Sequence, residues 1–177
     1  MKSPLKRAVM ACAILCASMF SAPAMAQDIS VATVTPVVST SPSYSAGDVV
    51  GGLITFQDAS RVNGAGGLLQ SVRVNFASSQ LALAMDFVWC GPSNLPNTTL
   101  TDNAAVSVAP ADFAACRVVH VTDCVSLGTP TACVADQLAI PYTLNNKTVG
   151  YGFLVTRGSL TMTSPSDVAV TLGLLRN

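Results

Sequence analysis

Short runs in which apolar and polar residues alternate, separated by turn-forming residues, dominate the chain after residue 44. In the run 68–76, three apolar residues alternate with two polar ones: Val72, Val74 and Phe76 against Arg73 and Asn75. This period of two indicates a strand with one buried face, because successive side chains of a strand point to opposite faces. The run 81–89 alternates in the same way, with Leu81, Leu83, Met85, Phe87 and Trp89 on one side.

Further runs rich in Val, Thr and aromatic residues are bounded by Gly, Pro, Asn and Asp, which predicts strands at short intervals. They cover the ranges 49–56, 117–122, 137–144, 148–156 and 167–175, with a single helical turn at 110–113. The fold class that follows is all-β: one antiparallel β-sandwich or jelly-roll-like domain of about seven to eight strands over 44–177. The range 27–43 is predicted to be an extended arm that carries an edge strand at 29–34, because Pro36 and Pro42 cannot donate to a sheet ladder.

The first 26 residues have the three parts of a secretory signal peptide. Lys2, Lys6 and Arg7 are followed by a 13-residue apolar run, 8–20, and then by the small residues Ala24 and Ala26. The apolar run is too short for a membrane span, which needs about 20 residues. We therefore expect cleavage after Ala26, no lipid anchor, no stable membrane insertion, and a mature protein in the periplasm or at the cell surface.

The charge of the chain argues against polyanionic partners. Without Lys2, Lys6 and Arg7, the mature part has six basic and nine acidic residues, a net charge of −3, and the charges are scattered. Binding to nucleic acid or to an anionic membrane requires clustered basic residues. We expect neither partner.

Four cysteines remain after the leader is removed: Cys90, Cys116, Cys124 and Cys133. An even number in an exported chain indicates two disulfides, for which three pairings exist. We favour Cys124–Cys133, which closes a short loop over 125–132, and Cys90–Cys116, which ties the end of one strand to the start of another. The alternative is a zinc site formed by these thiols and His120, but zinc ligands usually have closer C-x₂₋₄-C spacing.

The other candidate sites each have a simpler structural interpretation. His120, the only histidine, lies within a predicted strand. Asp123 is near it in sequence, but a catalytic base also needs a nucleophile, and the sequence has no serine motif such as G-x-S-x-G. Asp102-Asn103 could join a calcium site, but the surrounding carboxylates are isolated, so a turn with Asx-type hydrogen bonds is the better interpretation. Trp89 could be a binding platform, but its place in an alternating strand favours the core. We predict no catalytic residue, no metal and no cofactor, and ligand-binding residues cannot be chosen from the sequence.

Several local motifs occur together in a characteristic order. They are Tyr44-Ser45-Ala46-Gly47-Asp48-Val49-Val50-Gly51-Gly52, Leu69-Gln70-Ser71-Val72, Thr101-Asp102-Asn103-Ala104-Ala105, Tyr151-Gly152, Val155-Thr156-Arg157-Gly158 and Ser166-Asp167-Val168-Ala169-Val170-Thr171-Leu172. In this order the chain resembles small all-β proteins encoded among the structural genes of tailed phages and prophages, here with an added signal peptide. The resemblance covers 41–177 and implies a virion surface or decoration-like role.

These observations lead to two functional hypotheses. The first is a non-enzymatic exported structural or interaction protein, similar to phage decoration-type proteins, which self-associates or packs against another surface protein. The second is a secreted or periplasmic β-sandwich that binds a small ligand or a glycan, for which an exposed aromatic cluster would be the signature. Trp89, Tyr142 and Tyr151 are the residues to examine for such a cluster.

Overall fold

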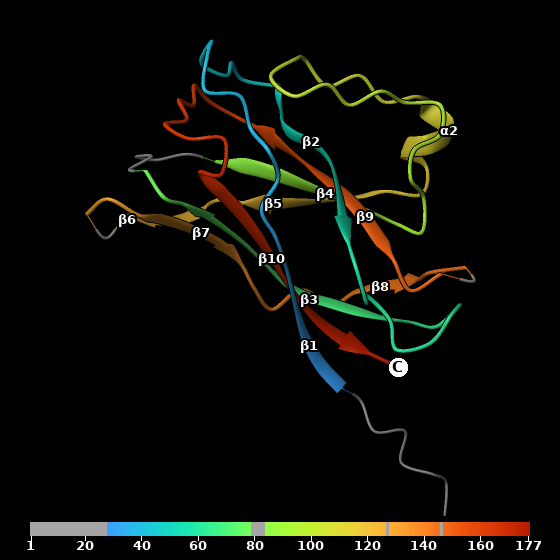
Figure 1. Cartoon of the computed structure of the whole chain (residues 1–177). Coiled ribbons are helices and arrows are strands. Elements are labelled where there is room, and N and C mark those ends of the chain that lie inside the picture. The colour runs from blue at the N-terminus through green and yellow to red at the C-terminus, as the bar shows by residue number, and fades with distance from the viewer. Residues whose placement is uncertain (1–27, 79–83, 127, 146) are drawn as a thin grey trace, which may run out of the picture.

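The computed structural model describes residues 28–78, 84–126, 128–145 and 147–177, and these form two antiparallel β-sheets that pack face to face (Figure 1). The expectation of an all-β sandwich is therefore confirmed. The predicted signal peptide with Ala24 and Ala26, and the start of the predicted strand at 81–83, lie outside the described residues.

The larger sheet has six strands in the order β1-β10-β3-β7-β6, with β8 beside the first half of β3. Their bounds are β1 Asp28–Val34, β3 Gly66–Phe76, β6 Asp123–Ser126, β7 Thr131–Ala135, β8 Ile140–Thr143 and β10 Val168–Arg176. The smaller sheet has the order β2-β9-β4-β5. Its strands are β2 Val49–Phe56, β4 Met85–Gly91, β5 Arg117–Val121 and β9 Gly150–Thr156, and the helical turn α2 spans Pro110–Phe113.

The alternation in the sequence translates directly into burial along β3. Val72, Val74 and Phe76 are buried between the sheets, whereas Arg73 is exposed on the outer face. In β4 the inward positions Met85, Phe87 and Trp89 are buried in the same core. The core of the sandwich therefore forms from the residues that the two-residue period selects.

An aromatic cluster lies at the centre of this core. Trp89 packs edge-on against Tyr142, with ring centroids 5.4 Å apart, and lies 6.0 Å from the ring of Phe56. The Tyr142 hydroxyl donates to the carbonyl of Ala59 at 2.6 Å, so the buried phenol has a partner. Burial raises the pKa of Tyr142 to about 12, because the phenolate would lose its hydration. Trp89 is thus a core residue beside a disulfide, as the strand pattern predicts.

One segment predicted as a loop contains two short strands. Positions 125–132 were expected to be a loop, but β6 and β7 extend into this range and form a hairpin. In that hairpin Cys124 and Cys133 are direct cross-strand neighbours. Strands of four and five residues are too short to show a clear alternation, so the cysteines were the only signal that the two segments meet.

The glycine pair in β2 produces a bulge. The register between β2 and β9 shifts between Val50 and Ile54, and Gly51 has a φ of 76°. A Cβ atom at Gly51 would come within 2.5 Å of Pro36 in the N-terminal arm, a distance that real Cβ atoms do not tolerate. The bulge at Gly51-Gly52 is therefore also the point where the arm meets the smaller sheet.

Candidate functional site

The outer face of the smaller sheet has side chains arranged in rungs across β9, β4 and β5. The middle rung is apolar and consists of Phe153, Val88 and Val118; the next rung consists of Val155, Asp86 and His120. Neighbouring side chains in such rungs have Cβ atoms about 4.5–5.5 Å apart. An outer sheet face is normally polar, so this apolar stripe calls for a cover or a partner.

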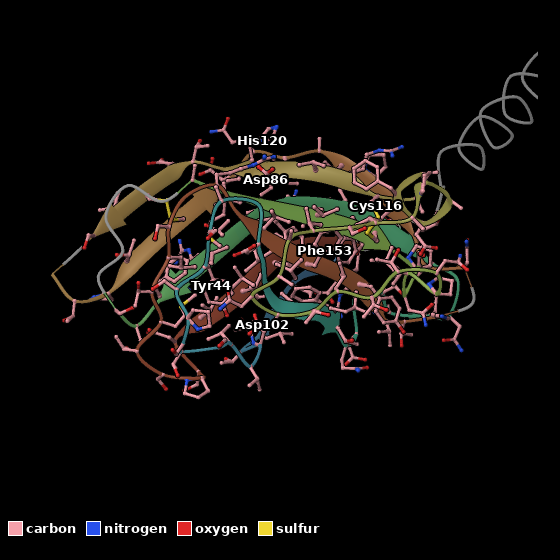
Figure 2. All side chains as sticks on the ribbon, turned by 90° about the horizontal axis from the view of Figure 1, so that it is seen from above. Tyr44, Asp86, Asp102, Cys116, His120 and Phe153 are labelled. Atoms are coloured by element: carbon pink, nitrogen blue, oxygen red, sulfur yellow. A yellow bond between two sulfur atoms is a disulfide. The ribbon has the colours of Figure 1, made fainter. Side chains whose placement is uncertain are left out.

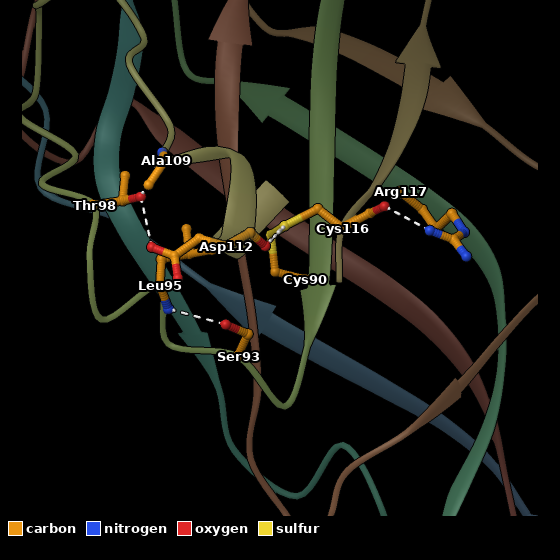
Figure 3. Close-up of a disulfide and its surroundings, with 8 residues drawn as sticks. All are labelled: Cys90, Ser93, Leu95, Thr98, Ala109, Asp112, Cys116 and Arg117. Carbon is orange, nitrogen blue, oxygen red and sulfur yellow. Dashed lines mark hydrogen bonds between the residues drawn. A yellow bond between two sulfur atoms is a disulfide. The ribbon is translucent and has the colours of Figure 1, made fainter. Parts of the chain in front are cut away.

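Part of the cover comes from the segment between β4 and β5, residues 92–116. Leu95 of this segment is buried with Val88, Phe153 and Val155 in a second apolar cluster, separate from the core between the sheets. Cys90 and Cys116 belong to the same cluster and close the segment at both ends with a disulfide (Figure 3). The covering segment is thus fixed to the sheet by a covalent bond and by buried apolar contacts.

A buried carboxylate organises the covering segment from within. Asp112, in α2, accepts hydrogen bonds from the Asn97 backbone N–H at 3.0 Å and from the Thr98 hydroxyl at 2.7 Å. Thr98 in turn accepts from the backbone N–H of Ala109 at 3.0 Å. Because Asp112 is nearly inaccessible to solvent, these bonds compensate for the loss of its hydration and hold the segment in one conformation.

The cover leaves an apolar groove of about 430 Å³ between α2, the covering segment and the sheet. Its floor includes Val88, Phe153 and Val118, and α2 contributes Phe113, of which 45% is exposed. Val106 and Val108 of the covering segment complete the apolar lining. The volume falls in the range of small-molecule sites, about 300–1,000 Å³. We call this feature the outer groove.

One end of the outer groove is polar. Asp86 lines it, is only 4% exposed, and lies with its Oδ1 2.7 Å from Nδ1 of His120 (Figure 2). Arg157, directly after β9, also lines the groove and donates from Nη2 to Oδ2 of Asp86. His120 and Arg157 remain 70% and 54% exposed. The buried carboxylate therefore holds two exposed nitrogen-bearing side chains at one end of an apolar groove.

Asp123 is the carboxylate nearest to His120 in sequence, but it is not the one that contacts the imidazole. The structure places Asp86, 34 residues earlier, against the imidazole, and Asp123 belongs to the hairpin of the larger sheet. The only available signal was that Asp86 occupies an outward position of an alternating strand, beside Val88. The described lining of the outer groove contains neither a hydroxyl nor a thiol side chain.

Both favoured cysteine pairs are disulfides in the structure. Cys90 is bonded to Cys116, and Cys124 is bonded to Cys133. The four sulfur atoms are therefore bonded in pairs and are not free to bind zinc as thiolates. Within the described ranges, no group of three or more His, Cys, Asp or Glu side chains is placed to hold a metal ion.

Asp102 binds the N-terminal arm. Its carboxylate accepts from the Tyr44 hydroxyl at 2.8 Å, from the Ser39 N–H at 2.6 Å and from the Gly51 N–H at 2.6 Å (Figure 2). Burial, together with the bond to Asp102, raises the pKa of Tyr44 above its usual value. All three partners are donors, so the carboxylate connects the arm to the bulge of β2, and no calcium ligand other than Asp102 itself is present in this set.

The three aromatic residues proposed as a glycan platform do not form one. Trp89 and Tyr142 are buried in the core, and only the half-buried Tyr151 is accessible, with the Lys147 amino group 5.5 Å from its ring centroid. A stacking site for sugar rings needs accessible aromatic faces. The exposed aromatic side chain in the lining of the outer groove is instead Phe113, in the predicted helical turn.

No protein-family model matches the chain, and no curated protein is similar to it in sequence. Among the described residues there is no helix that is both long enough and apolar enough to cross a membrane. The two disulfides are compatible with an exported protein.

Proposed function

We propose that the protein is an exported, non-catalytic binding domain whose ligand is a small apolar molecule held in the outer groove. The observation that carries this proposal is the apolar lining on an outer sheet face, with Phe113, Val106 and Val118 still exposed to solvent. Exposed apolar side chains that gather in a concavity are typical of ligand sites. The disulfide Cys90–Cys116 supports the same role, because it fixes the covering segment before a ligand arrives.

The test uses a neutral apolar dye, N-phenyl-1-naphthylamine, whose fluorescence rises when it leaves water. We expect Val118→Asp to weaken dye binding at least tenfold, because the new carboxylate would lie in the floor of the groove. Val125→Asp is the matched control: Val125 is equally a surface valine on an edge strand, but of the larger sheet. Equal dye binding by both variants, at unchanged thermal stability, would refute the proposal.

A second candidate is self-association, the role implied by the resemblance to phage structural proteins. It is favoured by β1, which pairs only with β10 among the described strands and exposes 73% of Ile29 and 68% of Val31. An edge strand with apolar side chains is a template for pairing with another chain. Light scattering coupled to size-exclusion chromatography would show a dimer that Val31→Lys dissociates, whereas a monomer at all concentrations would exclude this role.

A further inference from the structure

The polar end of the outer groove constrains the chemistry of its ligand. Asp86 is buried, and both of its oxygens are engaged, one by His120 and one by Arg157. Because Asp86 is almost inaccessible, a ligand cannot readily reach the lone pairs that remain on this carboxylate. What it finds are donors, because a guanidinium has five N–H groups and only the Nη2 contact to Asp86 occupies Arg157 among the described residues.

A single arginine beside a buried aspartate matches a ligand with one negative charge. Asp86 neutralises most of the local charge, so a phosphate with two charges would meet too few cations here. An ammonium group would meet the positive side of Arg157 and is disfavoured. A carboxylate suits the planar donor fork of arginine, with which it can form two parallel bonds.

The apolar part of the groove determines the size and character of the ligand beyond its head group. The lining runs from Asp86 and Arg157 over Val88, Phe153 and Val118 and encloses about 430 Å³. At roughly 30 Å³ per methylene group, about the share of one water molecule in the liquid, a chain of about eight to ten carbons fits in this volume. The walls formed by Val106, Val108 and Phe113 offer such a chain no hydrogen-bonding side chain.

We propose that the outer groove binds an amphipathic monocarboxylate of medium chain length, with its carboxylate on Arg157 and its apolar chain over Val88, Phe153 and Val118. This inference rests on the proposed function, because it specifies the ligand of the same groove. Asp86 then acts as a positioning residue: it orients Arg157 across the end of the groove and does not itself contact the ligand.

The experiment compares three probes of equal length by isothermal titration calorimetry on the oxidised protein: octanoate, 1-octanol and octylammonium. We expect octanoate to bind at least tenfold more tightly than octanol, and octylammonium to bind most weakly. Arg157→Gln should remove the advantage of octanoate while the affinity for octanol stays within twofold. Arg73→Gln, which removes an exposed arginine from the outer face of the larger sheet, should change neither affinity.

The outcomes separate the two proposals. If octanoate and octanol bind equally well, or if Arg157→Gln leaves the octanoate advantage intact, the carboxylate inference is overturned while the apolar groove keeps its role. If none of the three probes binds, both the inference and the proposed function fail. Retained octanol binding by Arg157→Gln shows that the variant is folded, so a loss of octanoate binding alone reports on the head group.

Discussion

The outer faces of the two sheets differ in chemistry although both sheets belong to one sandwich. The larger sheet presents mainly polar side chains around a concavity of about 380 Å³, including Ser71, Asn75, Thr171 and the exposed Arg73, with Val31 and Val134 also in its lining. The smaller sheet presents Val88, Phe153 and Val155, and a disulfide-closed segment lies over them. The first face is adapted to water; the second behaves as an additional core that is left open along one side.

This difference indicates where function resides. A fold needs apolar side chains between its sheets, but nothing in the sandwich itself requires an apolar outer face with its own cover. The covering segment costs conformational entropy to order, which the disulfide and the bonds of Asp112 reduce or offset. We interpret the apolar face and its fixed cover as the means by which the outer groove stays both apolar and open.

The largest expected effect tests whether the outer face of the smaller sheet contributes to stability as a core does. Phe153→Ala should lower the free energy of unfolding by about 3–5 kcal/mol, because Phe153 is fully buried under the covering segment. Arg73→Ala, on the other outer face, should change it by less than about 0.5 kcal/mol. Denaturant unfolding measures both, and equal effects would mean that the two faces do not differ.

The two disulfides provide the next test, because Cys90–Cys116 closes the covering segment of the smaller sheet and Cys124–Cys133 lies in the larger sheet. Replacing Cys90 and Cys116 by alanine removes a link between residues 26 positions apart and should lower the free energy of unfolding by about 3.5 kcal/mol. Replacing Cys124 and Cys133, which are 9 positions apart, should lower it by about 2.6 kcal/mol. Only the first pair of substitutions should also weaken dye binding in the outer groove. Loss of dye binding in both variants would show that the groove depends on general stability.

A buried carboxylate at the end of the larger sheet should affect stability without affecting the groove. Asp167 accepts four hydrogen bonds at 2.8–2.9 Å: each of Ser78 and Thr163 donates one from its backbone N–H and one from its hydroxyl. Burial alone would raise the pKa of Asp167, but these bonds outweigh it and lower the pKa. Its stabilising contribution is therefore present above the unfolded-state pKa of about 3.9 and is lost as the pH falls through the folded-state value.

Asp167→Asn should accordingly lower the free energy of unfolding by about 2 kcal/mol at pH 7, since the amide cannot satisfy all four donors. The difference between the two proteins should shrink as the pH is lowered below about 4. Urea unfolding across this pH range is the measurement, with dye binding recorded in parallel at pH 7. A difference that is constant with pH would contradict the ionised, hydrogen-bonded state of Asp167.

The smallest expected effect concerns the histidine at the polar end of the outer groove. His120→Ala should change the free energy of unfolding by less than about 1 kcal/mol, because the imidazole is 70% exposed and its bond to Asp86 is accessible to water. Thermal unfolding monitored by circular dichroism is sufficient to measure this. A loss above 2 kcal/mol would mean that the polar rung is a structural element of the sheet, comparable to the apolar rung beside it.

The sequence predicts the interior of this protein better than its outer surfaces. Alternation identifies the inward side chains of β3 and β4, and the expectation of export together with the cysteine spacing favours both observed disulfides. The hairpin of β6 and β7 is missed, because strands of four and five residues show too little periodicity. Each correct prediction depends on a local pattern or on a pair of chemically distinctive residues.

The outer groove depends on information that no local pattern contains. Asp86, His120 and Arg157 come together only through the register of β4 with β5 and with β9, which the sequence does not specify. The apolar rung of Val88 and Phe153 has the same origin, and Phe113 reaches the groove because the disulfide returns the covering segment to the sheet. A polar position inside an alternating strand, such as Asp86, was the only hint available.

The proposed binding face of this protein is the outer face of the smaller sheet. Mapping of amide chemical-shift changes on titration with 1-octanol tests it most directly, because a neutral ligand reports the site independently of head-group chemistry. We expect changes at Val88, Val118 and Phe153, with the amides of Ser71, Arg73 and Gly173 unaffected. Changes confined to the larger sheet, or none below the solubility limit of octanol, would contradict it.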